Sequence, residues 1–348
     1  KVIGGKFSVM ATEIYNQVSG QQNFTMGATV SVVLLVPALV AFFVDRLIQR
    51  RNYSLVTASS RPLQPVPNRL VDWGMLAYCA AIAGVIAGIY LVILVSSLVH
   101  RWPYNFGPTL KHYAFDTVGG YTPLLNSVYV ASLTAVVGTA LTFAGAYAVE
   151  KCRTIASGPL YLLSILPVAI PGMVLGLAYI FTFNAPGSVL NRLYGTMAIL
   201  VISNVIHYFT VGFLTATTSL KQLDAEFENV SASLGVPFYR TVWRVTVPIS
   251  LPSIIAISMY FFLNGMVTLS AVIFLVAPGT ELAAVAVLLM DDAGDTAQAA
   301  AMSVLIIGIG LAVRFLYWLV LRGVTRRTQA WMQPAAEQAE ADGANVPA

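Results

Sequence analysis

The stretch Ser219–Pro252, SLKQLDAEFENVSASLGVPFYRTVWRVTVPISLP, joins two long apolar segments and is the most informative part of the chain. Its apolar residues recur at steps of three and four, which places them on one face of a helix. Gly235 follows the last of them, where a glycine ends a helix at low cost, and Pro237 prevents the helix from resuming. The stretch therefore predicts a short amphipathic helix whose apolar face consists of Leu220, Leu223, Phe227, Val230 and Leu234.

A short amphipathic helix could instead lie flat at a membrane surface. The polar side of this one carries Asp224, Glu226 and Glu228, whereas helices that bind membrane surfaces usually carry Lys and Arg there. The acidic side therefore favours contact with another protein. Small residues at the end of the helix, Ser231, Ala232 and Ser233, would let a partner's backbone approach closely.

The segments on either side of this stretch are long and apolar. The chain of 348 residues is 57% hydrophobic and only 10% charged, with a mean hydropathy of +0.77, whereas soluble proteins carry about 25% charged residues. About 20 mostly apolar residues cross a bilayer as a helix. The sequence therefore predicts an all-α integral membrane protein, a polytopic bundle with spans at Met26–Ile48, Trp73–Val99, Leu124–Val149, Pro159–Phe183, Leu193–Thr217, Leu251–Ala277 and Ala297–Leu321.

Basic residues mark one side of this predicted bundle. Cytoplasmic loops of membrane proteins are enriched in Lys and Arg, so we expect this side, with the C-terminus, to face the cytoplasm. The opposite loops hold only Arg101, Lys111 and Arg192. The net charge of +4 is too small and too scattered for a nucleic-acid partner. The basic side carries Arg46, Arg50, Arg51, Arg61, Arg69, Lys151, Arg153, Lys221, Arg240, Arg244, Arg322, Arg326 and Arg327.

The two ends of the chain are weakly similar to each other. In both, a glycine-containing loop and a polar segment precede an apolar span that runs inward and ends in paired arginines, so the repeat is parallel. We interpret residues 1 to 50 as the end of a first repeat, and expect about five further spans to be encoded before Lys1. A shift of 274 positions places Gly5 on Gly279, Gly20 on Gly294, Val30 on Val304, Ala38 on Ala312 and Leu47 on Leu321.

The stretch Ser219–Pro252 resembles the EAA signature in the permeases of binding-protein-dependent ABC importers. That signature consists of Glu-Ala-Ala, three residues, Gly, nine residues and Ile-x-Leu-Pro. Gly235 takes the glycine position, and Val245–Pro248 follows it at the expected spacing. The chain departs at the front, where Asn229–Ser231 stands in place of Glu-Ala-Ala and Glu228 supplies the acid one step earlier.

This resemblance implies a type I ABC importer permease fold in a bacterial inner membrane. It also implies two protein partners: a cytoplasmic ATPase, with a cleft that would hold the predicted helix as a coupling helix, and a periplasmic solute-binding protein. Lipid would surround the spans. The residues that it assigns to coupling are Leu220, Leu223, Phe227, Glu228, Ser231, Ala232, Gly235 and Pro248.

The resemblance also divides the chain into parts. Residues 73–121 would form a scaffold helix and a periplasmic loop, and residues 122–322 the permease domain. Residues 51–72, rich in proline and serine, would form a cytoplasmic linker, and residues 323–348 a disordered cytoplasmic tail. The segment Thr268–Ser303 resembles the fused branch for ferric iron and 2-aminoethylphosphonate uptake, with a slight preference for the aminophosphonate.

Polar groups inside the predicted spans suggest a solute pathway. Such groups are costly in lipid and by default mark functional sites, although hydrogen bonding between helices is the alternative. Pro167, Pro171 and Gly172 should interrupt the fourth span and free backbone carbonyls. A stripe of small residues in the third span, which includes Gly138, is more typical of helix packing. The predicted pathway residues are Pro171, Gly172, Asn204, His207, Asn264 and Thr268.

The chain has no motif for catalysis. HExxH, GxSxG and GxxxxGK[ST] are all missing from the sequence, so we expect no catalytic residue and no cofactor, and ATP hydrolysis would need another polypeptide. The acidic DDAGDT segment is more typical of a solvated loop than of a metal site. A secondary transporter or channel without an ATPase is the main alternative, and a membrane enzyme is another. The parallel repeat and the lack of paired membrane acids argue against a secondary transporter.

Overall fold

The computed structural model describes residues 9–49, 68–115, 119–152, 155–185, 187, 189–223 and 226–328. Most of the predicted linker and the tail beyond residue 328 lie outside this part of the chain. Within the described residues, five helices are long and apolar enough to cross a membrane, or up to seven spans if two bent helix pairs each count as one. The five are α2 (Phe24–Gln49), α3 (Arg69–Leu98), α4 (Thr122–Glu150), α7 (Met197–Lys221) and α13 (Thr296–Thr328).

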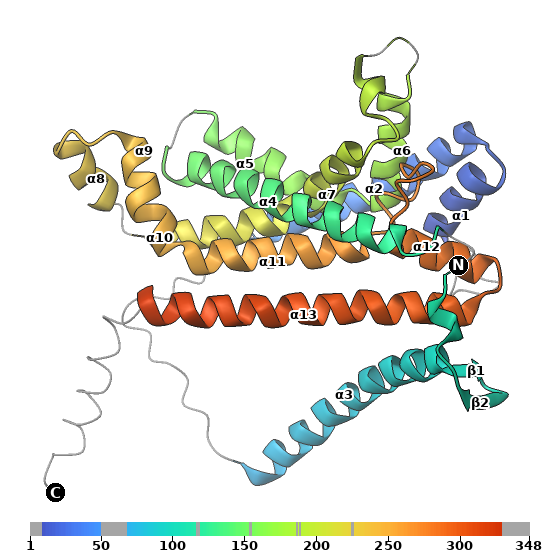
Figure 1. Cartoon of the computed structure of the whole chain (residues 1–348). Coiled ribbons are helices and arrows are strands. Elements are labelled where there is room, and N and C mark those ends of the chain that lie inside the picture. The colour runs from blue at the N-terminus through green and yellow to red at the C-terminus, as the bar shows by residue number, and fades with distance from the viewer. Residues whose placement is uncertain are drawn as a thin grey trace, which may run out of the picture.

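Helices α4, α7 and α11 (Leu251–Val267) form the packed centre of the molecule (Figure 1). The ring of Phe261 on α11 is fully buried. It fits because the facing positions are glycines: a Cβ atom at Gly138 of α4, or at Gly212 of α7, would lie 2.8 Å from the ring atoms of Phe261. The small-residue stripe of α4 therefore serves packing, as its composition indicated.

The predicted span Pro159–Phe183 is not one straight helix. It consists of α5 (Ser157–Ile165), the 3-10 turn η3 (Leu166–Ala169) and α6 (Gly172–Phe183), and the two helical parts meet at 109°. Pro171 lacks an N–H and pushes the residue before it into an extended conformation, and Ile170 indeed has ψ 115°. The break lies where the prolines predicted it.

The predicted span Leu251–Ala277 is too long. Helix α11 ends at Val267, and residues 268–282 run as turns before a short helix, α12 (Ala283–Asp292), that the sequence did not predict. Before α11, the chain forms α9 (Phe238–Thr241), the π-helical turn η5 (Val242–Thr246) and α10 (Val247–Ile249), and this segment is bent by 76° relative to α11.

Several short elements outside the long helices complete the fold. The short helix α1 (Met10–Tyr15) and the π turn η1 (Asn16–Gly20) precede α2 and pack against it. Strands β1 (Val99–Arg101) and β2 (Asn105–Pro108) form a small antiparallel hairpin after α3, and the fold is otherwise the predicted all-α bundle. The 3-10 turns η2 (Lys111–Tyr113) and η4 (Val189–Leu193) lie in loops.

The two outer helices α3 and α13 are arranged differently. Helix α13 runs alongside α11. Helix α3 lies beside α13 only near the start of α13 and points away from it elsewhere (Figure 1). Helix α13 also continues to Thr328, so the predicted tail does not begin at residue 323. We call the end of the bundle where α4 and α7 finish, with Lys151 and Lys221, the basic end.

Candidate functional site

The predicted amphipathic helix exists but is shorter than its apolar pattern indicated. Helix α8 runs from Glu226 to Ser233. Leu220 belongs to the last turn of α7 and is fully buried, and Leu223 lies in the following turn, partly buried against the core. The apolar repeat therefore runs from the end of α7 into α8. Periodicity alone does not reveal that these residues belong to two helices.

The rest of the apolar pattern is uncovered. Phe227, Val230 and Leu234 are 47%, 57% and 74% exposed, and we call these three residues the α8 apolar patch. The helix extends beyond the bundle at the basic end (Figure 1). Exposed apolar side chains that cluster on one element are typical of protein interaction sites.

Gly235 ends α8 in the left-handed conformation, with φ +67°, as its position in the sequence predicted. The N–H of Leu234 donates to the carbonyl of Val230 and the N–H of Val236 to that of Ser231, each at 3.0 Å. The hydroxyl groups of Ser231 and Thr241 share a short hydrogen bond that joins α8 to α9. The turn after α8 is therefore fixed by its own hydrogen bonds.

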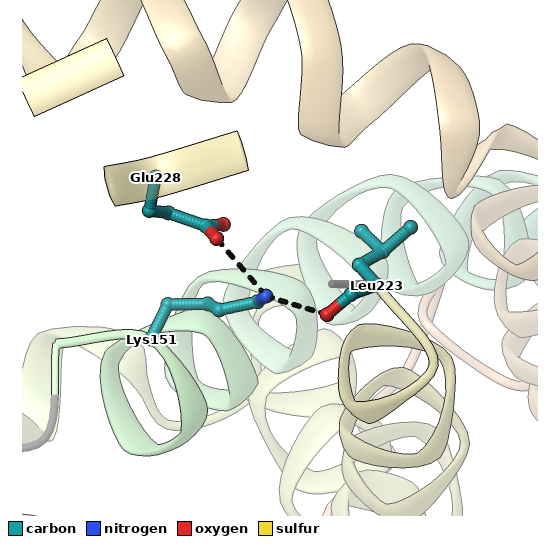
Figure 2. A network of polar contacts seen from close by, with 3 residues as sticks. All are labelled: Lys151, Leu223 and Glu228. Carbon is teal, nitrogen blue, oxygen red and sulfur yellow. Dashed lines mark hydrogen bonds and ion pairs between the residues drawn. The ribbon is translucent and has the colours of Figure 1, made fainter. Parts of the chain in front are cut away.

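Lys151 attaches α8 to the bundle (Figure 2). Its Nζ donates to the carbonyl oxygen of Leu223 at 3.0 Å and to Oε2 of Glu228 at 3.2 Å. Only 9% of the Lys151 side chain and 24% of the Glu228 side chain are exposed. The acid of the signature thus faces the end of α4. The sequence did not single out Lys151, because 77 positions separate it from Glu228.

The other predicted coupling residues lie in two places. Ala232 lies within α8, and Pro248 is exposed in α10, beside the bend that leads into α11. A second ion pair at the basic end joins Nζ of Lys221 to Oε1 of Glu150 at 3.6 Å, and this lysine is 61% exposed.

The predicted pathway residues lie around two helix breaks that pack against each other. Gly172, at the start of α6, is buried against Ser270 in the turns after α11. From the adjacent α7, Ser203 Oγ donates to the carbonyl of Ala271 at 3.1 Å. Three elements therefore meet where regular helix is interrupted, an arrangement that frees backbone groups inside the bundle.

Among the described residues, no hydrogen bond joins the polar side chains of the predicted pathway to one another. Asn204 is fully buried, and neither its amide nitrogen nor its oxygen has a partner. His207 Nδ1 is also buried without a partner, Thr268 interacts with the hydroxyl of Tyr208, and Asn264 Nδ2 donates to the carbonyl of Tyr260 at 2.8 Å. Buried polar groups are normally bonded, so the amide of Asn204 and Nδ1 of His207 are candidates for groups that gain partners in another conformation.

The chain matches the model of a family described as the binding-protein-dependent transport system inner membrane component, over residues 125–326. This is more than half of its length, and the chain belongs to this family. The match includes α8, both helix breaks and every predicted pathway residue.

Curated relatives include the ferric transport system permease protein FbpB of Actinobacillus pleuropneumoniae, which is 28% identical over 92% of this chain and 47% of its own length. FbpB 1 of Haemophilus influenzae, a putative ferric transport system permease protein, is 30% identical over 80% of this chain and 45% of its own length. The chain thus spans about half the length of these ferric relatives. The putative 2-aminoethylphosphonate permease protein PhnV of Salmonella typhi is 28% identical over 66% of this chain and 91% of its own length.

Solved structures support the fold. A bacterial ABC transporter involved in the import of the acidic polysaccharide alginate superposes with a TM-score of 0.60. It covers 74% of this chain at 14% sequence identity. The fold is therefore the type I permease fold that the resemblance implied.

Proposed function

We propose that the chain forms the solute pathway of an ATP-driven importer, and that α8 is its coupling helix, seated in a cleft of a separate ATPase subunit. The observation that supports this proposal most strongly is the α8 apolar patch, which is exposed on a helix that the bundle holds in place. Docking would bury these side chains, and each Å² of apolar surface removed from water would stabilise the complex by about 25 cal/mol. No catalytic motif is present in the sequence, so ATP hydrolysis would reside in the ATPase.

The contacts of α8 provide a route for motion. Leu220 and Leu223 anchor the segment before the helix in the core, and Lys151 connects the helix itself to the end of α4. Because α4 and α7 pack against each other along the bundle, a displacement of α8 would move both helices. Closure of the ATPase pair would then change the packing around the helix breaks.

The basic end would face the cytoplasm, since Lys and Arg concentrate there, and the C-terminus would lie on the same side. A periplasmic solute-binding protein would deliver solute at the opposite end. Membrane lipid would surround α2, α3 and the outer side of α13, whose exposed side chains are largely apolar.

We place the pathway along the two helix breaks and the buried face of α7. The unpaired amide of Asn204 supports this placement, because a group without a partner here would be satisfied in a conformation that admits water or solute. The residues proposed to line it are Pro171, Gly172, Asn204, His207, Asn264 and Thr268.

The arrangement of the two ends supports a parallel repeat. In residues 10–49 a short helix ends at Gly20 and a long helix follows, and in residues 283–328 a short helix is followed by Gly294 and another long helix. We propose that residues 1–50 correspond to the end of a first permease repeat, followed by the linker, the scaffold helix and a second repeat.

Ferric iron is the first candidate solute, because the ferric relatives match the larger share of this chain. 2-Aminoethylphosphonate is the second candidate. Uptake of each labelled solute into vesicles that contain the permease, its ATPase and its binding protein would separate them. Uptake without ATP would favour the alternative of a secondary transporter or channel.

The docking proposal is tested by a charge placed in the α8 apolar patch. Val230→Asp should sharply reduce the amount of ATPase that co-purifies with the permease, because a carboxylate would be buried in the contact. Val189→Asp makes the same exchange at an 82% exposed position in η4, near the opposite end, and should have no effect. Equal recovery of the ATPase with both variants would refute the proposal.

A further inference from the structure

A second polar feature at the basic end takes no part in the contacts of α8. A cavity of about 520 Å³ opens where the ends of α2 and α4 meet the start of α5. Its polar wall is formed by Arg46 of α2 and Ser157 of α5, and Val149, Tyr161 and Leu162 contribute apolar surface. The cavity thus combines a cation with an apolar wall at the boundary of the predicted membrane region.

Arg46 has no anionic partner among the described residues. Its guanidinium lies 4.9 Å from the ring centroid of Tyr161, its Nε is buried without a hydrogen bond, and no other hydrogen bond or ion pair is found for it. Ser157 Oγ is also buried without a partner. A cation held partly out of water normally has a counter-charge or a set of acceptors.

The acidic residues nearest to Arg46 in the chain and at the end of α4 are engaged elsewhere. Glu150, at the end of α4, is paired with Lys221. Asp45, the neighbour of Arg46 on α2, is exposed and makes an interaction of its own. The guanidinium of Arg46 is therefore a cation that an anion from outside the chain could neutralise.

We propose that this cavity binds the phosphate group of an anionic phospholipid. The guanidinium of Arg46 would donate to the phosphate oxygens, a contact for which arginine geometry is well suited. The hydroxyl of Ser157 and the uncapped first amides of α5 would add donors. Val149 and Leu162 would contact the first part of an acyl chain.

A lipid is the source of phosphate that fits this place. Among the described residues, little of the apolar length of α2 is covered, and basic pockets between membrane helices are known to hold anionic head groups. The inference shares the membrane placement of the proposed function but does not depend on α8. It can fail while the coupling proposal stands.

The test is a lipid titration of the purified, delipidated permease without its partners. Phosphatidylglycerol should raise the unfolding temperature in a dose-dependent way, and phosphatidylcholine should not. Arg46→Gln should weaken the response to phosphatidylglycerol about tenfold, since a charge-assisted hydrogen bond is lost. Arg322→Gln is the matched control, because Arg322 also stacks on a ring, 5.3 Å from the Trp318 centroid, but is exposed and lines no part of this cavity.

A second variant tests the same cavity in case Arg46→Gln does not fold. Gly158 lines the cavity in the first turn of α5 and has open space around it, so Gly158→Asp should fold, since an acid suits a helix N-terminus, and should abolish the lipid response. An equal loss in Arg322→Gln, or an unchanged response in Gly158→Asp, would overturn the proposal. A response to inorganic phosphate as large as that to the lipid would mean that the ligand is a soluble anion and not a phospholipid.

Discussion

At the scale of single residues, Gly235 shows how one conformation fixes a functional element. Its φ of +67° costs other residues about 1–2 kcal/mol, and a β-branched residue is especially unsuited to it. No atom lies within 4 Å of a Cβ built at this position, so a substitution would act through backbone strain and not through a clash.

Gly235→Val should therefore uncouple solute uptake from ATP hydrolysis while membrane insertion stays normal. Gly235→Asn is the control, because asparagine tolerates the left-handed conformation, and it should retain most of the coupling. The measurement is the ratio of uptake to ATP hydrolysis in reconstituted vesicles. Normal coupling by the valine variant would show that the shape of this turn is not important.

Lys151 is the residue with the largest predicted effect on α8. Lys151→Met removes the buried cation and leaves the Leu223 carbonyl and the Glu228 carboxylate without it, which should cost about 1–3 kcal/mol. Lys221→Met removes an exposed lysine and should cost about 0–1 kcal/mol. Thermal unfolding of the two variants measures the difference. Equal stability would mean that Lys151 does not hold α8.

At the scale of elements, the three-helix centre depends on close packing at glycines. A Cβ at Gly212 would lie 2.8 Å from Phe261 and 3.2 Å from Thr142. Gly212→Ala should therefore destabilise the protein by about 1–3 kcal/mol through overpacking. Gly84→Ala, on the uncovered helix α3 with open space around it, should be neutral or stabilising. Denaturation of both variants would distinguish packing from helix propensity, and a stable Gly212→Ala would contradict this account of the core.

How much of this architecture the sequence predicts depends on the element. Long apolar runs located α2, α3, α4, α7 and α13 to within a few residues, except that α13 continues beyond its predicted end. The prolines located the break before α6. Helix α12 was missed because the apolar run Leu282–Met290 is short and is flanked by acids, so that the segment resembles a polar loop. The 76° bend before α11 lies between Pro248 and Pro252 and was not predicted.

The sequence predicted those parts of the α8 site whose pattern lies within one short segment of the chain. Gly235 and the acid at position 228 follow from spacing along one short segment. The inward direction of Glu228, its partner Lys151 and the burial of Leu220 depend on contacts between distant segments. Periodicity therefore identified the apolar residues, but only the fold separates those that are buried from those that remain exposed.

At the scale of the whole molecule, the pathway proposal requires more than one conformation. Asn204 is fully buried here, so Asn204→Cys, in a background without Cys79 and Cys152, should resist a water-soluble thiol reagent in this state. ATP binding by the complete importer should expose it. Ala216→Cys, also fully buried on α7, should stay unreactive in both states. An Asn204→Cys variant that is unlabelled in every nucleotide state would mean that this amide is structural.

The central claim is that the α8 apolar patch is the docking surface for the ATPase. The most direct measurement is the rate at which a thiol reagent modifies Val230→Cys, in a background without Cys79 and Cys152, with and without the ATPase bound. We predict rapid modification of the free permease and strong protection in the complex, whereas Val189→Cys should react equally in both. Equal rates at position 230 with and without the ATPase would contradict the claim.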